Sequence, residues 1–299
     1  MVGRDRSAGQ PYNDPPIRGL SVVQATLRIF VALECWGFAV SRLVSGKPSS
    51  LNRLLQQDFS LPASVASTLD QSVAWCLLIC GFVTLVRPLW PLLVAISLWT
   101  IAQPIAALVT RFGILPQLEP AQEAVRWMAP IALLFVDFWP PRLKFTYARY
   151  QMAMGLLRLG VAVTFLACGL LLIHHSGRTS PLADMLIRGA TRLHLGTLSP
   201  ERAHFALGIL GGLEFGIGLT MLLGRSLSGA ALATLVGLGA AMLPTIARGT
   251  AGYHETLIHL IDGGAPLALF ACWSLGYVEH PPTPIAAHVR FGAESREPH

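Results

Sequence analysis

The sequence predicts an all-α integral membrane protein with about eight transmembrane helices. Of its 299 residues, 53% are hydrophobic and only 13% are charged, whereas soluble domains carry about 25% charged residues. The mean hydropathy is +0.55, and most charges gather between long apolar stretches. Because lipid cannot satisfy backbone N–H and C=O groups, each stretch that crosses the membrane must be a helix.

Eight apolar segments have roughly the length that crosses about 30 Å of hydrocarbon. They are residues 21–44, 72–86, 89–109, 121–139, 152–173, 204–223, 227–247 and 253–277. The stretch 111–120 holds two prolines and is predicted to be a loop. Leucine-containing segments at 51–55 and 182–195 are predicted to be short helices that lie in the membrane interface.

Outside these segments the chain is polar and basic. The N-terminal arm, residues 1–20, lacks the apolar core of a signal peptide, so we expect a surface arm. The C-terminal tail, residues 279–299, has the same character. The net charge of +6 comes from Lys and Arg that mostly flank apolar segments. This arrangement favours the lipid bilayer as partner and argues against nucleic acid.

The distribution of basic residues also bears on orientation. The N-terminal arm and the mid-chain loop with Arg142, Lys144 and Arg149 favour cytoplasmic N and C termini, in a bacterial-type inner membrane. The connections on the opposite side carry nearly as many positive charges, so the preference is small.

The two halves of the chain resemble each other, which predicts a duplication. The matches, in the same order in both halves, are 27–32 with 157–162, Arg87 with Arg225, Pro104 with Pro244, and 129–135 with 265–270. We therefore expect two tandem four-helix bundles, residues 21–141 and 142–278, related by a pseudo-two-fold axis along the membrane normal.

Ionisable side chains inside apolar segments are candidates for function, because each costs several kcal/mol unless it is paired or hydrated. Arg28 and Arg158 occupy matching positions in the first helix of each half. Each is predicted to be an interfacial anchor or a member of an ion pair, and Arg158 is also a candidate ligand contact. Glu34 interrupts the first segment and is a secondary candidate.

Glu214 lies in a run whose glycines at 208, 212 and 216 are four residues apart. That spacing predicts a smooth, closely packed helix face. The carboxylate must then face the interior of the bundle, where Arg158 is its candidate partner. The pair is either a structural clamp or a site at which Glu214 orients a ligand or handles a proton.

Glu255, His259 and Asp262 are spaced i, i+4 and i+7, which places them on one helix face. His254 lies beside them at the helix start and is a secondary candidate. Histidine and carboxylate are metal-ligand types, but the two histidines are five residues apart and do not share a face. A hydrogen-bond or proton network is therefore favoured, and no metal is predicted.

The first half differs at the corresponding positions. Glu119 falls at the same offset as Glu255, and is a further secondary candidate. The region that corresponds to His259 and Asp262 holds Glu123 and Arg126 instead. This asymmetry predicts that any active pocket belongs to the second half.

The second half, about residues 152–277, resembles the DoxX family of small four-helix membrane proteins. The resemblance rests on Leu157-Arg158, the long connection before Pro200, and Gly211-Gly212-Leu213-Glu214 running on to Leu222-Leu223-Gly224. In the first half the corresponding run lacks the intramembrane glutamate, and Asp70 is the nearest carboxylate. Only Arg158 and Glu214 match the family pattern residue by residue. The resemblance implies membrane redox work, such as that of a thiosulfate:quinone oxidoreductase subunit, or a partnership in thiol and oxidative-stress systems.

The leading hypothesis is a membrane subunit that binds a quinone or similar small apolar ligand beside Glu214 and Arg158. Glu255, His259 and Asp262 would handle protons. The chain has no haem-attachment motif, no iron–sulfur cysteine set and no nucleotide loop, so other membrane or redox subunits would supply electrons. Two alternatives remain: a non-catalytic scaffold or assembly subunit of a larger membrane complex, and a small-solute transporter.

Overall fold

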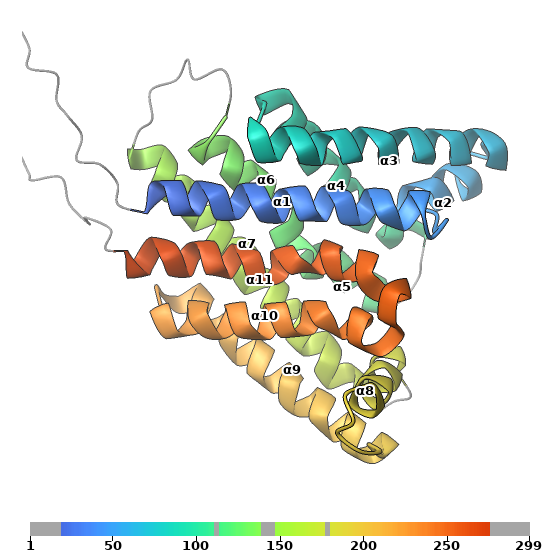
Figure 1. The fold of residues 1–299 in the computed structure, drawn as a ribbon, viewed down its shortest axis with the longest axis vertical. Coiled ribbons are helices and arrows are strands. Elements are labelled where there is room, and N and C mark those ends of the chain that lie inside the picture. The colour runs from blue at the N-terminus through green and yellow to red at the C-terminus, as the bar shows by residue number, and fades with distance from the viewer. Residues whose placement is uncertain (1–18, 111–113, 139–146, 177–179, 276–299) are drawn as a thin grey trace, which may run out of the picture.

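The computed structural model describes residues 19–110, 114–138, 147–176 and 180–275, and its regular elements within these ranges are helices (Figure 1). The elements are α1 (Leu20–Leu43), α2 (Ser50–Gln57), α3 (Ala63–Val86), α4 (Trp90–Thr110), α5 (Ile114–Gln122), α6 (Ala124–Val136), α7 (Tyr147–His175), α8 (Pro181–Arg192), α9 (Pro200–Leu223), α10 (Leu227–Arg248), the 3₁₀ turn η1 (Gly249–Gly252) and α11 (Tyr253–Ser274).

Among the described residues, six helical stretches are long and apolar enough to cross a membrane, as in an integral multi-pass protein. The last of them, Leu227–Ser274, is 48 residues long and contains both α10 and α11. These two helices fold back on each other through η1. The hydroxyl oxygens of Thr245 and Thr256 lie 2.7 Å apart, and a Cβ on Gly237 would lie 2.8 Å from Cα of Gly263. The stretch is therefore a helical hairpin.

The outer surface has the character that lipid contact requires. Large apolar side chains are exposed on α3 and α9, among them Trp75, Ile79, Phe205 and Ile209. Exposed apolar surface of this extent is unfavourable in water and favourable against acyl chains.

The fourth predicted segment is two helices rather than one. Residues 111–120 were predicted to be a loop, but α5 occupies Ile114–Gln122 and is separated from α6 by a turn at Glu123. The loop prediction was wrong because Pro116 falls in the first turn of α5, where a backbone N–H has no helical partner in any case. The short helices predicted at 51–55 and 182–195 are present as α2 and α8. Serine caps each of them: Ser49 accepts from the backbone of Asn52, and Ser180 from that of Leu182.

The helices pack in corresponding pairs in the two halves. In the first half α1 packs on α3, α2 on α4 and α4 on α6; in the second, α7 packs on α9, α8 on α10 and α10 on α11. The last helix of each half also lies against the first helix of the other, α11 on α1 and α6 on α7 (Figure 1). One hydrophobic core therefore runs through both halves, with Leu27, Leu133, Leu157 and Leu269 fully buried in it.

Glycines permit the closest helix contacts. A Cβ on Gly81 of α3 would lie 3.1 Å from the carbonyl oxygen of Ala32 in α1, and one on Gly218 of α9 would lie 2.9 Å from that of Ala162 in α7. The close-packing face of α9 was predicted at the glycines 208, 212 and 216. That prediction was wrong for 212 and 216, which face open space, because the α7 contact is made by Gly211 and Gly218.

This difference predicts opposite effects at adjacent glycines. A Cβ on Gly211 would lie 2.8 Å from the carbonyl oxygen of Gly169 and 2.9 Å from the backbone nitrogen of Ile173. Gly211→Ala should therefore destabilise the protein by about 1–3 kcal/mol through overpacking. Gly212→Ala should be neutral or stabilising by about 0.5–1 kcal/mol, because alanine costs less backbone entropy. Reversible unfolding in mixed detergent micelles, followed by far-UV circular dichroism, measures both; equal effects would contradict the α7–α9 packing.

Candidate functional site

Four charged or titratable side chains meet where α6 faces α11, and we call them the α6–α11 ion cluster: Glu123, Arg126, His259 and Asp262. The Arg126 guanidinium lies 2.9 Å from Oε1 of Glu123 and 3.4 Å from Oδ2 of Asp262. The Arg126 side chain is only 7% exposed. Because a lone charge is costly to bury, Arg126 depends on these two carboxylates for its position.

His259 lies between Arg126 and Asp262 and is within hydrogen-bond distance of both. Its Nδ1 lies 2.8 Å from Nη2 of Arg126 and 3.0 Å from Oδ2 of Asp262. With Nδ1 deprotonated, the ring accepts from Arg126; with Nδ1 protonated, it donates to Asp262. The two hydrogen bonds use opposite states of the same nitrogen. The ring therefore sits where gaining or losing a proton changes which neighbour it binds.

Glu34 of α1 lies beside this cluster and is completely buried. Arg126, Asp262 and Glu123 are the charged groups that act on it electrostatically. Neither carboxyl oxygen of Glu34 has a hydrogen-bond partner in the described part of the chain. Three carboxyl groups thus lie around one guanidinium, so the site holds more carboxyl groups than counter-charges.

Next to the cluster lies an apolar cavity of about 310 Å³ between α7, α8, α9, α10 and α11. Its walls are mostly aliphatic, including Leu172, Leu186 and Leu210. The ionisable and thiol groups that line it are Cys168, Glu214, Glu255, His259 and Asp262. An apolar chamber of this size with a few convergent polar groups is the usual form of a small-molecule site.

Four of the predicted site residues line this one cavity. Glu255, His259 and Asp262 come from the predicted common face of α11, and Glu214 comes from α9. Glu214 is 5% exposed, and its Oε2 has no hydrogen-bond partner among the described residues. A buried carboxyl oxygen without a partner at a cavity wall is available to a ligand.

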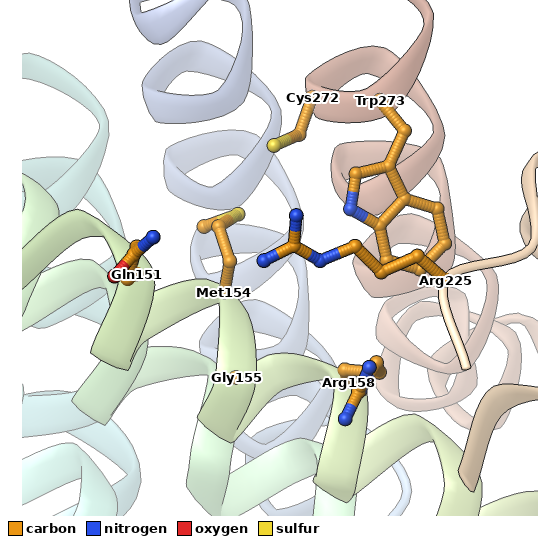
Figure 2. A pocket seen from close by; sticks show the side chains of 7 residues that line it. All are labelled: Gln151, Met154, Gly155, Arg158, Arg225, Cys272 and Trp273. Carbon is orange, nitrogen blue, oxygen red and sulfur yellow. The ribbon is translucent and has the colours of Figure 1, made fainter. Parts of the chain in front are cut away.

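Arg158 lies elsewhere, so the predicted Arg158–Glu214 pair is wrong. It lines a separate pocket of about 120 Å³ with Arg225, Cys272 and Trp273 (Figure 2). Contacts of Gly169 with Phe215 place Glu214 level with residue 169 of α7. Arg158 precedes that position by three helical turns, or about 16 Å at a rise of 1.5 Å per residue. The antiparallel register of α7 and α9 therefore keeps the two side chains apart.

Arg28, which matches Arg158 in the repeat, forms an ion pair with Asp137, the residue that ends α6. Of the secondary candidates, Glu119 lies in α5, and its carbonyl oxygen accepts from the backbone of Glu123. It does not line the cavity. Arg28 and Glu119 thus lie outside the wall of the apolar cavity.

One end of the cavity is closed by an ion pair network at Glu255. Its Oε1 lies 2.5 Å from Nζ of Lys47, and its other oxygen accepts from Arg248. His254, 1% exposed, has its Nδ1 3.2 Å from the hydroxyl of Ser45. The connection between α1 and α2 thus holds the start of α11 through two contacts.

Sequence analysis did not select Arg126, Glu123, Lys47 or Cys168 as site residues. For the first two a signal was present: in the predicted duplication, Glu123 and Arg126 fall in the region that corresponds to His259 and Asp262. Their charges are complementary to those of His259 and Asp262, which could have indicated contact. Cys168 lies in an apolar run with no distinguishing pattern.

Within the described ranges, no group of three or more His, Cys, Asp or Glu side chains has a metal-binding arrangement. Comparison of the chain with protein-family models, with curated proteins and with solved structures found no match.

Proposed function

We propose that this chain is an integral membrane subunit that binds a small, largely apolar molecule, such as a quinone, in the apolar cavity and supports the redox chemistry of a partner. The observation that carries the proposal is the convergence of Glu214, His259 and Asp262 on the wall of that cavity. The aliphatic walls suit an isoprenoid or alkyl substituent. The resemblance of the second half to the DoxX family supports the redox partner.

The roles of the side chains follow from quinone chemistry. Reduction of a quinone to a hydroquinone takes up two electrons and two protons, one on each oxygen. A partner subunit with a redox centre would supply the electrons. Glu214, with its unpartnered oxygen, would accept a hydrogen bond from a hydroxyl of the hydroquinone head group. His259 would pass protons, because its Nδ1 lies within hydrogen-bond distance of both Arg126 and Asp262.

The proposal includes two related repeats, 21–141 and 142–278, with eight membrane crossings in which α5 and α6 together form the fourth. The matching helix pairs support this arrangement. So do Gly81 and Gly218, each of which meets the carbonyl of a matched alanine, Ala32 or Ala162. The start of α1 touches the end of α11, since a Cβ on Gly19 would lie 2.8 Å from Leu275. Both described ends thus lie on one side, which we assign to the cytoplasm of a bacterial-type inner membrane.

The function is tested by replacing the buried carboxylate. Glu214→Gln should weaken binding of a short-chain ubiquinol about tenfold to a hundredfold, because the Glu214 carboxylate accepts from a hydroquinone hydroxyl and a hydrogen bond to a charged group contributes about 1.5–3 kcal/mol. Titration calorimetry of the protein in lipid nanodiscs measures the affinity. Glu201→Gln, an exposed carboxylate at the start of the same helix, is the matched control and should bind as the wild type does. Absence of ubiquinol binding to the wild type, or equal affinity in both variants, would refute the ligand proposal.

The alternative of a scaffold subunit is favoured by one observation. Gly212 and Gly216 of α9 face open space on the outside of the bundle, and such a face permits close approach of another membrane helix. Native mass spectrometry after gentle extraction from the membrane distinguishes the two. A bound quinone supports the ligand proposal, whereas a stable complex that never carries a small ligand supports the scaffold.

A further inference from the structure

A second cavity, of about 500 Å³, opens where α8 meets the end of α10. Three arginines line it, Arg188 and Arg192 from α8 and Arg248 from α10. Thr191, Ile187, Ala247 and Ala251 complete its wall. It shares none of these residues with the apolar cavity, although the two are neighbours along both helices.

The local structure brings the arginines of α8 and α10 to the wall of this cavity. Arg188, Thr191 and Arg192 are spaced i, i+3 and i+4 and so share a face of α8. An adjacent side of α8 packs on α10, because Gly189 is buried against Leu243 and Ile246. Gly249, at φ +64°, ends α10 and leaves room for Arg192, whose Nη1 would lie 2.8 Å from a Cβ at that position.

The cavity has an excess of positive charge. Arg248 is paired with Glu255, which Lys47 also contacts. Neither Arg188 nor Arg192 forms an ion pair with any residue of the described chain, including Asp184 one turn earlier on α8. The end of α10 contributes about half a negative charge, which is too little to balance two guanidinium groups. Like charges one turn apart also repel each other, so α8 carries an arrangement that an anion would stabilise.

We propose that this cavity binds a phosphate group. Guanidinium groups bind phosphate oxygens through paired, charge-assisted hydrogen bonds, and the hydroxyl of Thr191 is a further donor. Basic pockets between helices at the membrane surface are suited to the head groups of anionic lipids. The same chemistry serves free inorganic phosphate, and the experiment separates the two sources. The proposal is independent of the ligand in the apolar cavity.

The test compares two double variants that remove the same charge. Arg188→Gln/Arg192→Gln alters the cavity, whereas Arg53→Gln/Arg202→Gln removes two exposed arginines of α2 and α9 that line none of it. Arg248 is retained, so that Glu255 keeps its partner. Each protein is titrated in phosphatidylcholine nanodiscs with inorganic phosphate, and separately reconstituted in nanodiscs that contain a small fraction of fluorescent phosphatidylglycerol. Energy transfer from the protein's tryptophans to the fluorescent lipid reports lipid binding.

The expected result is a loss of about tenfold or more in affinity in the Arg188/Arg192 variant, with the control close to wild type. Loss confined to phosphatidylglycerol identifies a lipid head group, and loss in the phosphate titration identifies a free anion. Both outcomes support the site. Absence of both kinds of binding, or equal binding in the two variants, would overturn it. Quinone affinity should be unchanged in both variants. Failure of the phosphate proposal can therefore be told apart from failure of the proposal for the apolar cavity.

Discussion

Replacing Arg126 by glutamine should destabilise the protein by about 3–5 kcal/mol, because it leaves buried carboxylates without their counter-charge. Glu123 and Asp262 both contact the guanidinium, and Glu34 lies beside them with no hydrogen-bond partner among the described residues. The free energy of unfolding, measured in mixed detergent micelles, gives the loss. This is the largest loss of stability that we expect from a single substitution in this chain.

Arg158→Gln is the matched control for that experiment. Arg158 is also an arginine within an apolar helical segment. It lines a pocket with Arg225 and Trp273 and contacts no carboxylate among the described residues. Its replacement should cost less than about 1 kcal/mol. Adding Asp262→Asn to Arg126→Gln should recover part of the lost stability, and the double-mutant cycle gives their coupling. Equal losses for Arg126→Gln and Arg158→Gln would show that the α6–α11 ion cluster contributes nothing to stability.

Filling the apolar cavity should abolish most ligand binding without removing any polar group. Ala240 of α10 lines the cavity, and tryptophan at this position would occupy the space of the ligand. A clash of about 1–3 kcal/mol corresponds to a tenfold to hundredfold loss of quinone affinity. Titration calorimetry in nanodiscs measures it.

The control places the same side chain on the outer face of the same helix. Leu235 is 71% exposed and does not line the cavity, so Leu235→Trp should bind quinone as the wild type does. If Ala240→Trp also retains full affinity, the quinone binds elsewhere and the proposed function loses its site.

The long helices were accessible to prediction because lipid imposes a simple rule on them. α1 lies within one residue of the predicted segment at both ends, and α10 begins at the predicted residue, Leu227. The errors fall where the hydropathy rule is weak. α3 begins at Ala63, well before the predicted 72, because its first turns are polar and still helical. The turn at Glu123 interrupts an apolar segment that hydropathy treats as one helix.

In the candidate site, too, local features could be predicted from the sequence and contacts between distant segments could not. The common face of Glu255, His259 and Asp262 follows from helical geometry alone, and the three line one cavity. The partners of these residues come from distant segments, Lys47 before α2 and Arg126 in α6. Arg158 was assigned to Glu214 by charge alone. The register of α7 against α9, set by Gly169 and Gly211, decides that contact, and it depends on packing rather than on composition.

The last helix of each half packs on the first helix of the other half, and this arrangement has a consequence for biosynthesis. α1 is made first, but α11, on which it packs, is made last. The roughly 210 residues between Leu43 and Tyr253 take about 10–40 s to translate at 5–20 residues per second. The Glu34 carboxyl has no Arg126 near it until α6 is made, and no α11 beside it until the end of the interval. The nascent helix must therefore wait at the insertion machinery, or enter the bilayer with that carboxyl protonated, until the rest of the chain arrives.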